Sequence, residues 1–444
     1  MSARLRPGPR SRGPRALSGA ALACALLAAC SRTPEAPRPD PTAAGFWFTA
    51  RERPDVDLGA LGYAAGTRPE SPSLAAPIGG RVHLPEATAP GLNLWCAGHA
   101  PEAYLETLAG EPVHRWAVDP DRLPGVPPLR HATQRAWRRV RLLPDGGLLA
   151  LHEAHALLRL DVDSALVWAV GEGAHHDFDL DAAGRVHVLV RRAVEHPGIA
   201  GGQTVVDDGV LVLGPDGAVV ARHSLLEALA RSPWAHVLDA AAAQPDGRTL
   251  DAGDGLARDL LHVNAYALLR SVPAGLPAAF QPGRALLCFR ELDALALFDP
   301  EAGALVWYSA GALDGPHDPE LGADGRLWVF DNGLRRGWSR AVALDPSTGR
   351  EVAAWPAAPD PAFHSEVCGA LQLLPHGGLL LTESTAGRAF EVTAEGALAW
   401  SYATPHRVER RSPDGPSERF VACLFEVERI APEDLPARFR SALR

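Results

Sequence analysis

The sequence contains no lysine, and all 43 of its basic residues are arginines. It has a single methionine, Met1, and only three asparagines, Asn93, Asn264 and Asn332. The absence of lysine excludes a lysine nucleophile, a Schiff-base lysine and the phosphate-binding lysine of a P-loop. Because asparagine is scarce and arginine abundant, Asn264 and Asn332 attract attention, whereas any single arginine is a weak signal.

The composition is that of an ordinary globular protein. The chain has 444 residues, of which 47% are hydrophobic and 22% charged, which excludes a disordered or collagen-like chain. The formal net charge is −10, and no stretch is rich in arginine and aromatic residues together. Nucleic acid is therefore not an expected partner.

The first 29 residues have the pattern of an export signal. An arginine-rich start leads into the apolar run 16–29, which is too short to remain as a membrane-spanning helix. The run ends in Leu27-Ala28-Ala29-Cys30, which resembles a bacterial lipobox, so we expect Cys30 to carry a lipid anchor. The alternative is a plain signal peptide with an incidental cysteine. Since Ser31 follows, the resemblance implies an exported lipoprotein of the Gram-negative outer membrane, facing the periplasm or the cell surface.

The remaining chain divides into three predicted parts. Residues 30–85 contain the lipidated cysteine and a tether rich in proline and alanine, residues 86–432 form the folded domain, and residues 433–444 form a tail. The folded domain has four cysteines, which form either two disulfides with three possible pairings or buried free thiols. Their spacing matches no zinc motif, and we expect neither a metal nor another cofactor. The four are Cys96, Cys288, Cys368 and Cys423.

The folded domain repeats itself about every 48 residues. In the units 142–170, 321–356 and 373–402, an Asp-Gly or Gly-Gly turn opens two short apolar runs, and a later strand ends in tryptophan. Such turns supply the positive φ angles that tight hairpins require. An arginine takes the tryptophan position in the unit that starts near residue 214. The strand-ending residues are Trp116, Trp168, Arg222, Trp307, Trp355 and Trp400.

Six repeats of this length, each with about four strands, predict an all-β fold, a six-bladed β-propeller. A β-sandwich is the alternative, but its strands would not recur at so long a period. The alternating segment 420–430 is expected to complete the first blade and close the ring, which removes a free sheet edge. We interpret 175–213 and 230–283 as enlarged loops and 225–232 as a short helix.

Histidine phrases occur just before the predicted inner strand of several blades. Propellers bind ligands at the mouth of the central channel, so these side chains can converge there although they are distant in sequence. Each histidine alone is more often an ordinary loop residue, but four in one register favour a site. The phrases contain His175 and His176, His262, His317, and His364.

Two of the three asparagines lie in or near these phrases. Asn264 follows His262 by two residues, and Asn332 belongs to an Asp-Asn-Gly segment, which is alternatively a simple turn. An arginine-rich continuation contains Arg336 and Arg340. Because guanidinium groups bind tetrahedral oxyanions in a bidentate manner, the pattern indicates sulfate or phosphate groups. Ordinary surface arginines are an equal alternative.

Taken together, these phrases resemble the bacterial arylsulfate sulfotransferases, a family of exported six-bladed propellers. The resemblance covers roughly residues 90–430, with its clearest matches at 260–268, 289–307, 315–333, 339–346 and 373–392. It implies transfer of a sulfuryl group from an aryl sulfate to a phenol without a nucleotide donor. The expected partners are thus an aryl sulfate, a phenol or another small anionic molecule.

The resemblance also implies roles for individual residues. His262, His317 and Arg336 match the catalytic positions, with Asn264, Asn332, Arg340 and His176 as substrate-binding residues. In characterised members a histidine of the last blade is transiently sulfated. Here the corresponding strand and turn, 381–388, contain no histidine, and His364 is the nearest substitute.

Two other functions compete with an enzyme of this type. The first is a non-catalytic propeller of the cell envelope that binds a ligand or serves as a scaffold, in which case His262 and Arg336 would be dispensable. The second is a quinone-dependent dehydrogenase, which would require a carboxylate set for calcium that the sequence does not offer.

Overall fold

The computed structural model describes residues 51–52, 66–69, 78–126, 129, 135–243, 249–252, 255–411 and 417–443. Cys30 lies outside this range, as do the export signal and most of the tether. Residues 38–444 form one compact unit. No helix in the described ranges is long and apolar enough to cross a membrane.

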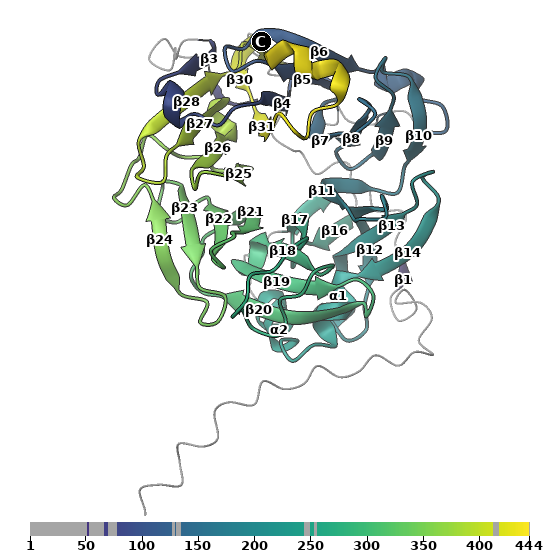
Figure 1. Cartoon of the computed structure of the whole chain (residues 1–444). Coiled ribbons are helices and arrows are strands. Elements are labelled where there is room, and N and C mark those ends of the chain that lie inside the picture. Colours follow the sequence, from purple (N-terminus) through teal and green to yellow (C-terminus); the bar gives the residue numbers. More distant parts are fainter. Residues whose placement is uncertain are drawn as a thin grey trace, which may run out of the picture. The chain divides into compact units, whose positions relative to one another are not determined.

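Six four-stranded blades surround a central channel, which confirms the predicted six-bladed β-propeller (Figure 1). In every blade, consecutive strands pair antiparallel from the channel outward. The first blade contains β31 (Leu424–Ile430), β4 (Leu92–Ala97), β5 (Glu102–Glu106) and β6 (Pro112–Ala117). The second contains β7 (Trp137–Leu142), β8 (Leu148–His152), β9 (Ala156–Leu160) and β10 (Leu166–Val170). The third contains β11 (Ala174–Leu180), β12 (Val186–Glu195), β13 (Thr204–Leu213) and β14 (Val219–Ser224).

The other three blades follow the same order. The fourth contains β17 (Val263–Leu268), β18 (Ala285–Phe289), β19 (Ala294–Asp299) and β20 (Ala304–Ala310). The fifth contains β21 (Pro316–Leu321), β22 (Leu327–Asp331), β23 (Arg340–Leu344) and β24 (Glu351–Trp355). The sixth contains β25 (Ala370–Leu373), β26 (Leu379–Glu383), β27 (Arg388–Val392) and β28 (Leu398–Ala403), to which β3 (Gly79–Val82) adds an outer strand.

The ring closes as the sequence predicts. The C-terminal strand β31 pairs antiparallel with β4, so one blade combines both ends of the propeller. This arrangement leaves no unpaired inner edge at the joint. The C-terminal segment Ala437–Leu443 forms a 3-10 helix whose Phe439 is buried beside Trp116, with ring centroids 6.0 Å apart.

The repeated tryptophans lie on the outermost strands and connect neighbouring blades. The indole nitrogens of Trp168, Trp307, Trp355 and Trp400 each donate to a backbone carbonyl in a turn of the next blade, over 2.7–3.3 Å. The acceptors are Pro215, Pro346, Gly396 and Leu108. The repeat therefore reflects one inter-blade contact used four times. Arg222, at the same position on β14, instead forms an ion pair with Glu172.

Both predicted loops contain regular structure. Residues 230–283 include α2 (His236–Ala242), β15 (Thr249–Ala252), β16 (Gly255–Arg258) and the inner strand β17 (Val263–Leu268). Residues 175–213 form β11 and the long strands β12 and β13, which pair over ten residues from Val186 to Glu195. The valine-rich pattern of both strands buries side chains on both faces, which produces continuous apolar runs rather than a clear alternation. The predicted short helix at 225–232 is confirmed as α1 (Leu225–Ala230), which begins after Ser224, whose hydroxyl accepts from the amide of Glu227.

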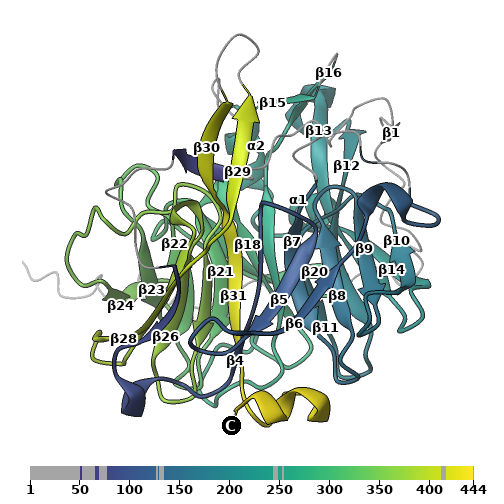
Figure 2. The same cartoon turned by 90° about the horizontal axis from the view of Figure 1, so that it is seen from above.

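Additional elements extend one end of the propeller (Figure 2). A three-stranded sheet contains β2 (Gly66–Pro69), β29 (Arg407–Arg411) and β30 (Ser417–Ala422), and β30 leads directly into β31. Helix α2 (His236–Ala242) is followed by a hairpin of β15 (Thr249–Ala252) and β16 (Gly255–Arg258), which precedes β17. The short strand β1 (Arg51–Glu52) pairs with β12. Since β17 and β31 begin here, this end carries the start of the inner strands. Short 3-10 helices occur at Pro85–Ala87, Pro120–Arg122, Ala200–Gly202, Arg290–Leu292 and Ser384–Ala386.

Candidate functional site

The inner strands share a local irregularity where they begin. The pairing register shifts near Arg138 in β7, between Ala174 and Phe178 in β11, and likewise at the start of β17, β21 and β31. Bulges of this kind redirect side chains at the rim of a barrel. Four residues other than glycine near these starts adopt positive φ: His176, His262, Asp318 and Cys368. Strained backbone of this type clusters at functional sites, so we take this end of the channel as the candidate site.

His317 on β21 is held in a single tautomer by Asn332. Its Nδ1 lies 2.7 Å from Oδ1 of Asn332 and 3.2 Å from the carbonyl of Gly315, and both are acceptors, so Nδ1 carries the proton. Burial and the guanidinium of Arg138 lower the pKa of His317 to about 3. The imidazole is thus neutral at ordinary pH, and its Nε2 keeps a lone pair.

His262 is oriented by a carboxylate. Its backbone amide donates to Oδ1 of Asp259 over 2.9 Å, and its Nδ1 donates to Oδ2 over 2.6 Å. Burial acts to lower the pKa of His262, but the charge and hydrogen bond of Asp259, together with the charges of Glu291 and Asp208, raise it above its ordinary value. The His262 side chain retains 16% exposure, and its ring contacts that of His176 with centroids 4.9 Å apart.

His175 and His176 continue the group on β11. Their Nδ1 atoms are 2.8 Å apart, Nε2 of His175 lies 3.2 Å from Asp208, and the amide of His176 donates to Glu153 over 3.0 Å. All of these side chains are buried. Glu153, His175 and His176 bring three potential metal ligands within 4.8 Å of one another.

Arg138 supplies a fixed cation at the same end of the channel. Its Nη1 donates to the sulfur of Cys368 over 2.9 Å, its Nε lies 3.8 Å from Glu153, and its guanidinium lies over the ring of Phe425. A hydrogen bond from Cys423 is the main reason that the pKa of Cys368 falls to about 6, and Arg138 adds to it against the effect of burial. Together, a guanidinium and several imidazoles in a buried site can stabilise an oxyanion.

Family comparison agrees with this geometry. The arylsulfotransferase (ASST) family matches residues 139–405, which is more than half of the chain and includes most of the residues described above. The chain belongs to the arylsulfotransferase family. No curated protein matches it.

Solved propellers are similar only in a general way. A Bacteroides caccae protein of unknown function is 13% identical, with a TM-score of 0.43 over 71% of this chain and 94% of its own. Virginiamycin B lyase from Staphylococcus aureus is 11% identical, with a TM-score of 0.35 over 64% and 83%. BamB from Moraxella catarrhalis is 11% identical, with a TM-score of 0.34 over 74% and 82%.

In this arylsulfotransferase-family member, the two arginines that the sequence predicts as site residues, Arg336 and Arg340, form their contacts within the fifth blade. Arg336 pairs with Asp331 over 3.0 Å, donates to the carbonyl of Trp338 and stacks on its ring. Arg340 also pairs with Asp331, over 3.2 Å, and with Glu351. Because the Asp331 carboxylate is fully buried, this pairing accounts for both guanidinium groups within the described residues.

The remaining predicted residues, Asn264 and His364, form hydrogen bonds near the starts of their blades. Asn264 donates to the carbonyl of Pro316 over 2.9 Å, and its buried Oδ1 has no hydrogen-bond partner. The amide of His364 donates to Glu383, and its carbonyl accepts from Thr385, so the described contacts of this backbone lie within the sixth blade. Arg138, Glu153, Asp208 and Asp259 are site residues that the sequence analysis missed.

All four cysteines of the described domain are free and buried, so of the two alternatives left by the sequence, disulfides or free thiols, the structure shows free thiols.

Further along the channel, a cavity of about 480 Å³ is lined by carboxylates and by three arginines, Arg139, Arg141 and Arg270. Arg139 there pairs with Asp177, Asp318 and Glu426 over 2.9–3.2 Å.

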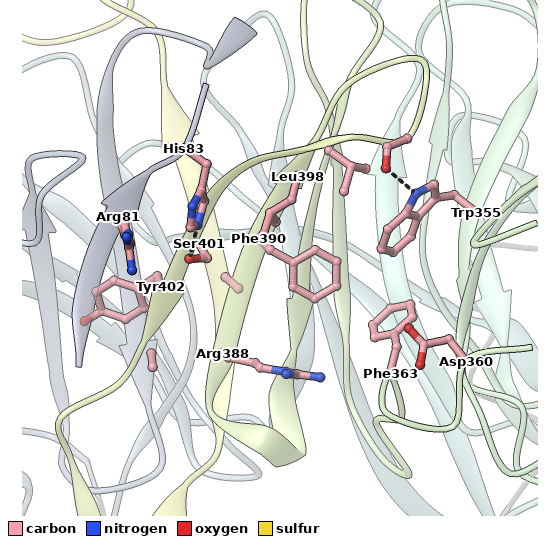
Figure 3. A pocket seen from close by; sticks show the side chains of 14 residues that line it. Arg81, His83, Trp355, Asp360, Phe363, Arg388, Phe390, Leu398, Ser401 and Tyr402 are labelled. Atoms are coloured by element: carbon pink, nitrogen blue, oxygen red, sulfur yellow. Dashed lines mark hydrogen bonds between the residues drawn. The ribbon is translucent and has the colours of Figure 1, made fainter. Parts of the chain in front are cut away.

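A separate pocket of about 400 Å³ lies between the fifth and sixth blades (Figure 3). Its aromatic lining includes Trp355, Phe363 and Phe390, and Arg388 points along its lower edge. Arg388 already pairs with Glu383 and donates to the carbonyl of Ala362. The side chains that line this pocket therefore mainly pack the fifth blade against the sixth. The pocket is separate from the site that contains His176, His262 and His317.

Proposed function

We propose that the protein transfers a sulfuryl group from an aryl sulfate to a phenol through a sulfated histidine, without a nucleotide donor. The observation that carries this proposal is the fixed neutral tautomer of His317. Its Nδ1–H is held by Asn332, and the amide of Asn332 donates to the carbonyls of Ser365 and Cys368 over 2.7 and 2.6 Å. Membership of the arylsulfotransferase family supports the same chemistry.

In the first step, Nε2 of His317 attacks the sulfur atom of the aryl sulfate. An N–S bond forms, the S–O bond to the aryl group breaks, and the phenolate leaves. In the second step, the oxygen of an acceptor phenol attacks the same sulfur, and the N–S bond breaks. His317 is thereby restored, and one difficult displacement becomes two easier ones.

His262 and Arg138 assist both steps. Because Nδ1 of His262 is bound to Asp259, its Nε2 is the atom that donates a proton to the departing phenolate and removes one from the acceptor. The guanidinium of Arg138 is fixed by its contacts to Cys368 and Phe425 and stabilises charge on the sulfuryl oxygens. Burial of His317 and Arg138 limits the access of water, which would otherwise hydrolyse the sulfated histidine.

The test is incubation of the folded protein with 4-nitrophenyl sulfate and a series of phenols. We expect nitrophenol release that depends on the acceptor, together with formation of the acceptor sulfate. His317→Gln should abolish transfer, whereas His187→Gln, which alters a buried histidine of β12 outside the site, should not. Absence of nitrophenol release by the wild type with every acceptor would contradict the proposal and favour a ligand-binding or scaffold propeller.

We also propose that the chain is an exported lipoprotein anchored through Cys30, which leaves the catalytic domain outside the cytoplasm. The support is the sequence 27–30 at the end of the apolar run. Palmitate labelling of the wild type and of Cys30→Ala tests this, with Cys24→Ala as the matched control. Equal labelling of the wild type and Cys30→Ala would overturn the anchor.

A further inference from the structure

We infer that Glu153, His175 and His176 form a binding site for one divalent transition-metal ion, for which Zn²⁺ is the appropriate probe. The three residues lie at the channel-facing ends of two adjacent blades. Glu153 directly follows β8, and the two histidines are on β11. One ligand atom from each lies within 4.8 Å of the other two. This inference is independent of the proposed function, because it concerns binding of the ion alone.

The distances suit a small ion. Nδ1 of His176 lies 3.7 Å from Oε1 of Glu153 and 2.8 Å from Nδ1 of His175. Tetrahedral zinc ligands at about 2.0–2.1 Å from the metal are about 3.3 Å from one another. Since all three atoms lie within 4.8 Å of one another, changes of up to about 1.5 Å in their separations would bring them to bonding distance. Two nitrogens and one carboxylate oxygen, with a coordination position left open, are typical of catalytic zinc sites.

An unsatisfied acceptor faces this group. Oε2 of Glu153 accepts from the amide of His176, but Oε1 is buried and has no hydrogen-bond partner. The Glu153 side chain is only 5% exposed, so bulk solvent hardly reaches it. A buried carboxylate oxygen without a partner is costly, and a cation next to it removes that cost.

A second layer of residues orients the ligands. Nε2 of His175 lies 3.2 Å from Oδ1 of Asp208, within ion-pair distance but without the geometry of a hydrogen bond, and the opposite nitrogen, Nδ1, faces His176. A carboxylate behind a metal-binding histidine fixes its tautomer and increases its basicity. The guanidinium groups of Arg138 and Arg191 lie 3.8 and 3.9 Å from Glu153 and balance its charge in the absence of metal.

The ligand atoms can reach the required protonation state without an external base. With the Nε2 proton of His175 directed to Asp208, its Nδ1 accepts from Nδ1 of His176. When the ion binds, the proton of His176 moves to its Nε2, and both Nδ1 atoms present lone pairs. Glu153 binds through Oε1 and keeps its hydrogen bond from the His176 amide.

The experiment titrates the chelator-treated full-length protein with Zn²⁺ by calorimetry and with Co²⁺ by visible absorption. We expect one equivalent to bind and Co²⁺ to show the bands of a nitrogen- and oxygen-ligated site. Glu153→Gln and His176→Asn should each weaken binding at least tenfold, and Asp208→Asn about 10- to 100-fold. Asparagine suits position 176 because it tolerates the positive φ found there.

His187→Gln is the matched control, since His187 is also a buried histidine of the third blade that faces an aspartate, Asp181, over 3.4 Å. The Zn²⁺ affinity of the His187→Gln variant should equal that of the wild type. Circular dichroism and thermal unfolding establish that each variant is folded, and His176→Asn replaces Glu153→Gln where the latter does not fold. Absence of stoichiometric binding by the wild type would overturn the site, as would an equal loss in His187→Gln and His176→Asn.

Discussion

Oδ1 of Asn332 lies 2.7 Å from Nδ1 of His317, and the amide nitrogen of the same asparagine donates to the carbonyls of Ser365 and Cys368. The two donated bonds determine which way the amide faces, and the amide oxygen in turn determines the tautomer of the imidazole. Asn332 therefore connects the fifth blade to the start of the sixth and holds the imidazole of His317 in one orientation and one tautomer.

Replacing this asparagine should impair transfer more than it impairs folding. In Asn332→Ala, His317 loses its main acceptor and rotates or changes tautomer, so we expect kcat to fall about 10- to 100-fold. Two buried carbonyls also lose a donor, which should lower the free energy of unfolding by about 1–3 kcal/mol. Steady-state kinetics and urea unfolding measure the two effects.

Asn93→Ala is the matched control for this prediction. Asn93 is equally buried and accepts from Nε of Arg429 over 2.7 Å, far from the histidines in sequence and in a different blade. The Asn93→Ala variant should lose about as much stability as Asn332→Ala, whereas its kcat, measured on the folded protein, should be unchanged. An equal loss of kcat in both variants would mean that Asn332 acts only through stability.

Loss of Arg138 should lower kcat, whereas loss of Arg336 should lower the unfolding free energy. Arg138→Gln removes the guanidinium whose charge reaches both His176 and His317, and we expect kcat to fall about 10²- to 10³-fold. Arg336→Gln removes one of the two cations paired with the buried carboxylate of Asp331. It should lower the unfolding free energy with little change in kcat. The opposite result would restore the assignment made from the sequence.

The contrast between these arginines explains what the sequence could and could not predict about the site. The histidine phrases stand in one register of the repeat, so their position at the start of inner strands was predictable. Arg138 occupies the equivalent register of the second blade, but it stands among many arginines and next to no histidine. Arg336 was favoured because it follows Asn332 closely, and only three-dimensional structure shows that Asp331 binds it.

His317 should make the protein less stable in acid. The unfolded chain binds a proton at this histidine near pH 6.5, whereas the folded protein, with burial, Arg138 and His262 acting against the charge, does so only near pH 3. The unfolding free energy therefore falls as the pH decreases between these values. His317→Gln should remove about 1.4 kcal/mol per pH unit from that slope. Urea unfolding at several pH values measures it, and an unchanged slope would contradict the assignment.

Glu320 in the channel cavity should act in the opposite direction. Burial and the charge of Asp318 raise its pKa to about 8, although the amide of Leu373 and the charge of Arg139 act against the shift. The unfolded carboxyl ionises near pH 4.5, so the unfolding free energy falls as the pH rises from there to about 8. Glu320→Gln should therefore stabilise the protein at pH 8, by at least about 1 kcal/mol.

Glu102→Gln serves as the control of opposite sign. Its hydrogen bond with Arg115 lowers the pKa of Glu102 to about 2, so ionisation of this carboxyl stabilises the fold above the unfolded value and the contribution disappears only in strong acid. The variant should be less stable than the wild type at pH 8. If both glutamine variants shift stability in the same direction, the raised pKa of Glu320 is wrong.

The fold was predictable because one contact recurs. Four tryptophans at the same position of their blades each donate to a turn in the next blade, and the same spacing therefore repeats along the chain, with β31 completing the ring. The third blade was harder to recognise, because Arg222 replaces the tryptophan and pairs with Glu172. Its valine-rich strands β12 and β13 also run for ten residues each and bury both faces, so they show no alternating pattern.

A buried ion pair contributes to the closure of the ring. We expect replacement of one of its two residues to destabilise the protein more than replacement of both. Arg429 on β31 pairs with Glu391 of the sixth blade over 3.0 Å, donates to Asn93 of the first blade and lies over the ring of Trp400. Arg429→Leu leaves the fully buried Glu391 carboxylate with His376 as its remaining ion-pair partner and should cost about 3–5 kcal/mol of unfolding free energy. Adding Glu391→Gln should recover most of that loss, because the uncompensated charge is removed. Urea unfolding of both single variants and the double variant measures the coupling, and simple additivity of the two losses would show that the pair does not hold the ring closed.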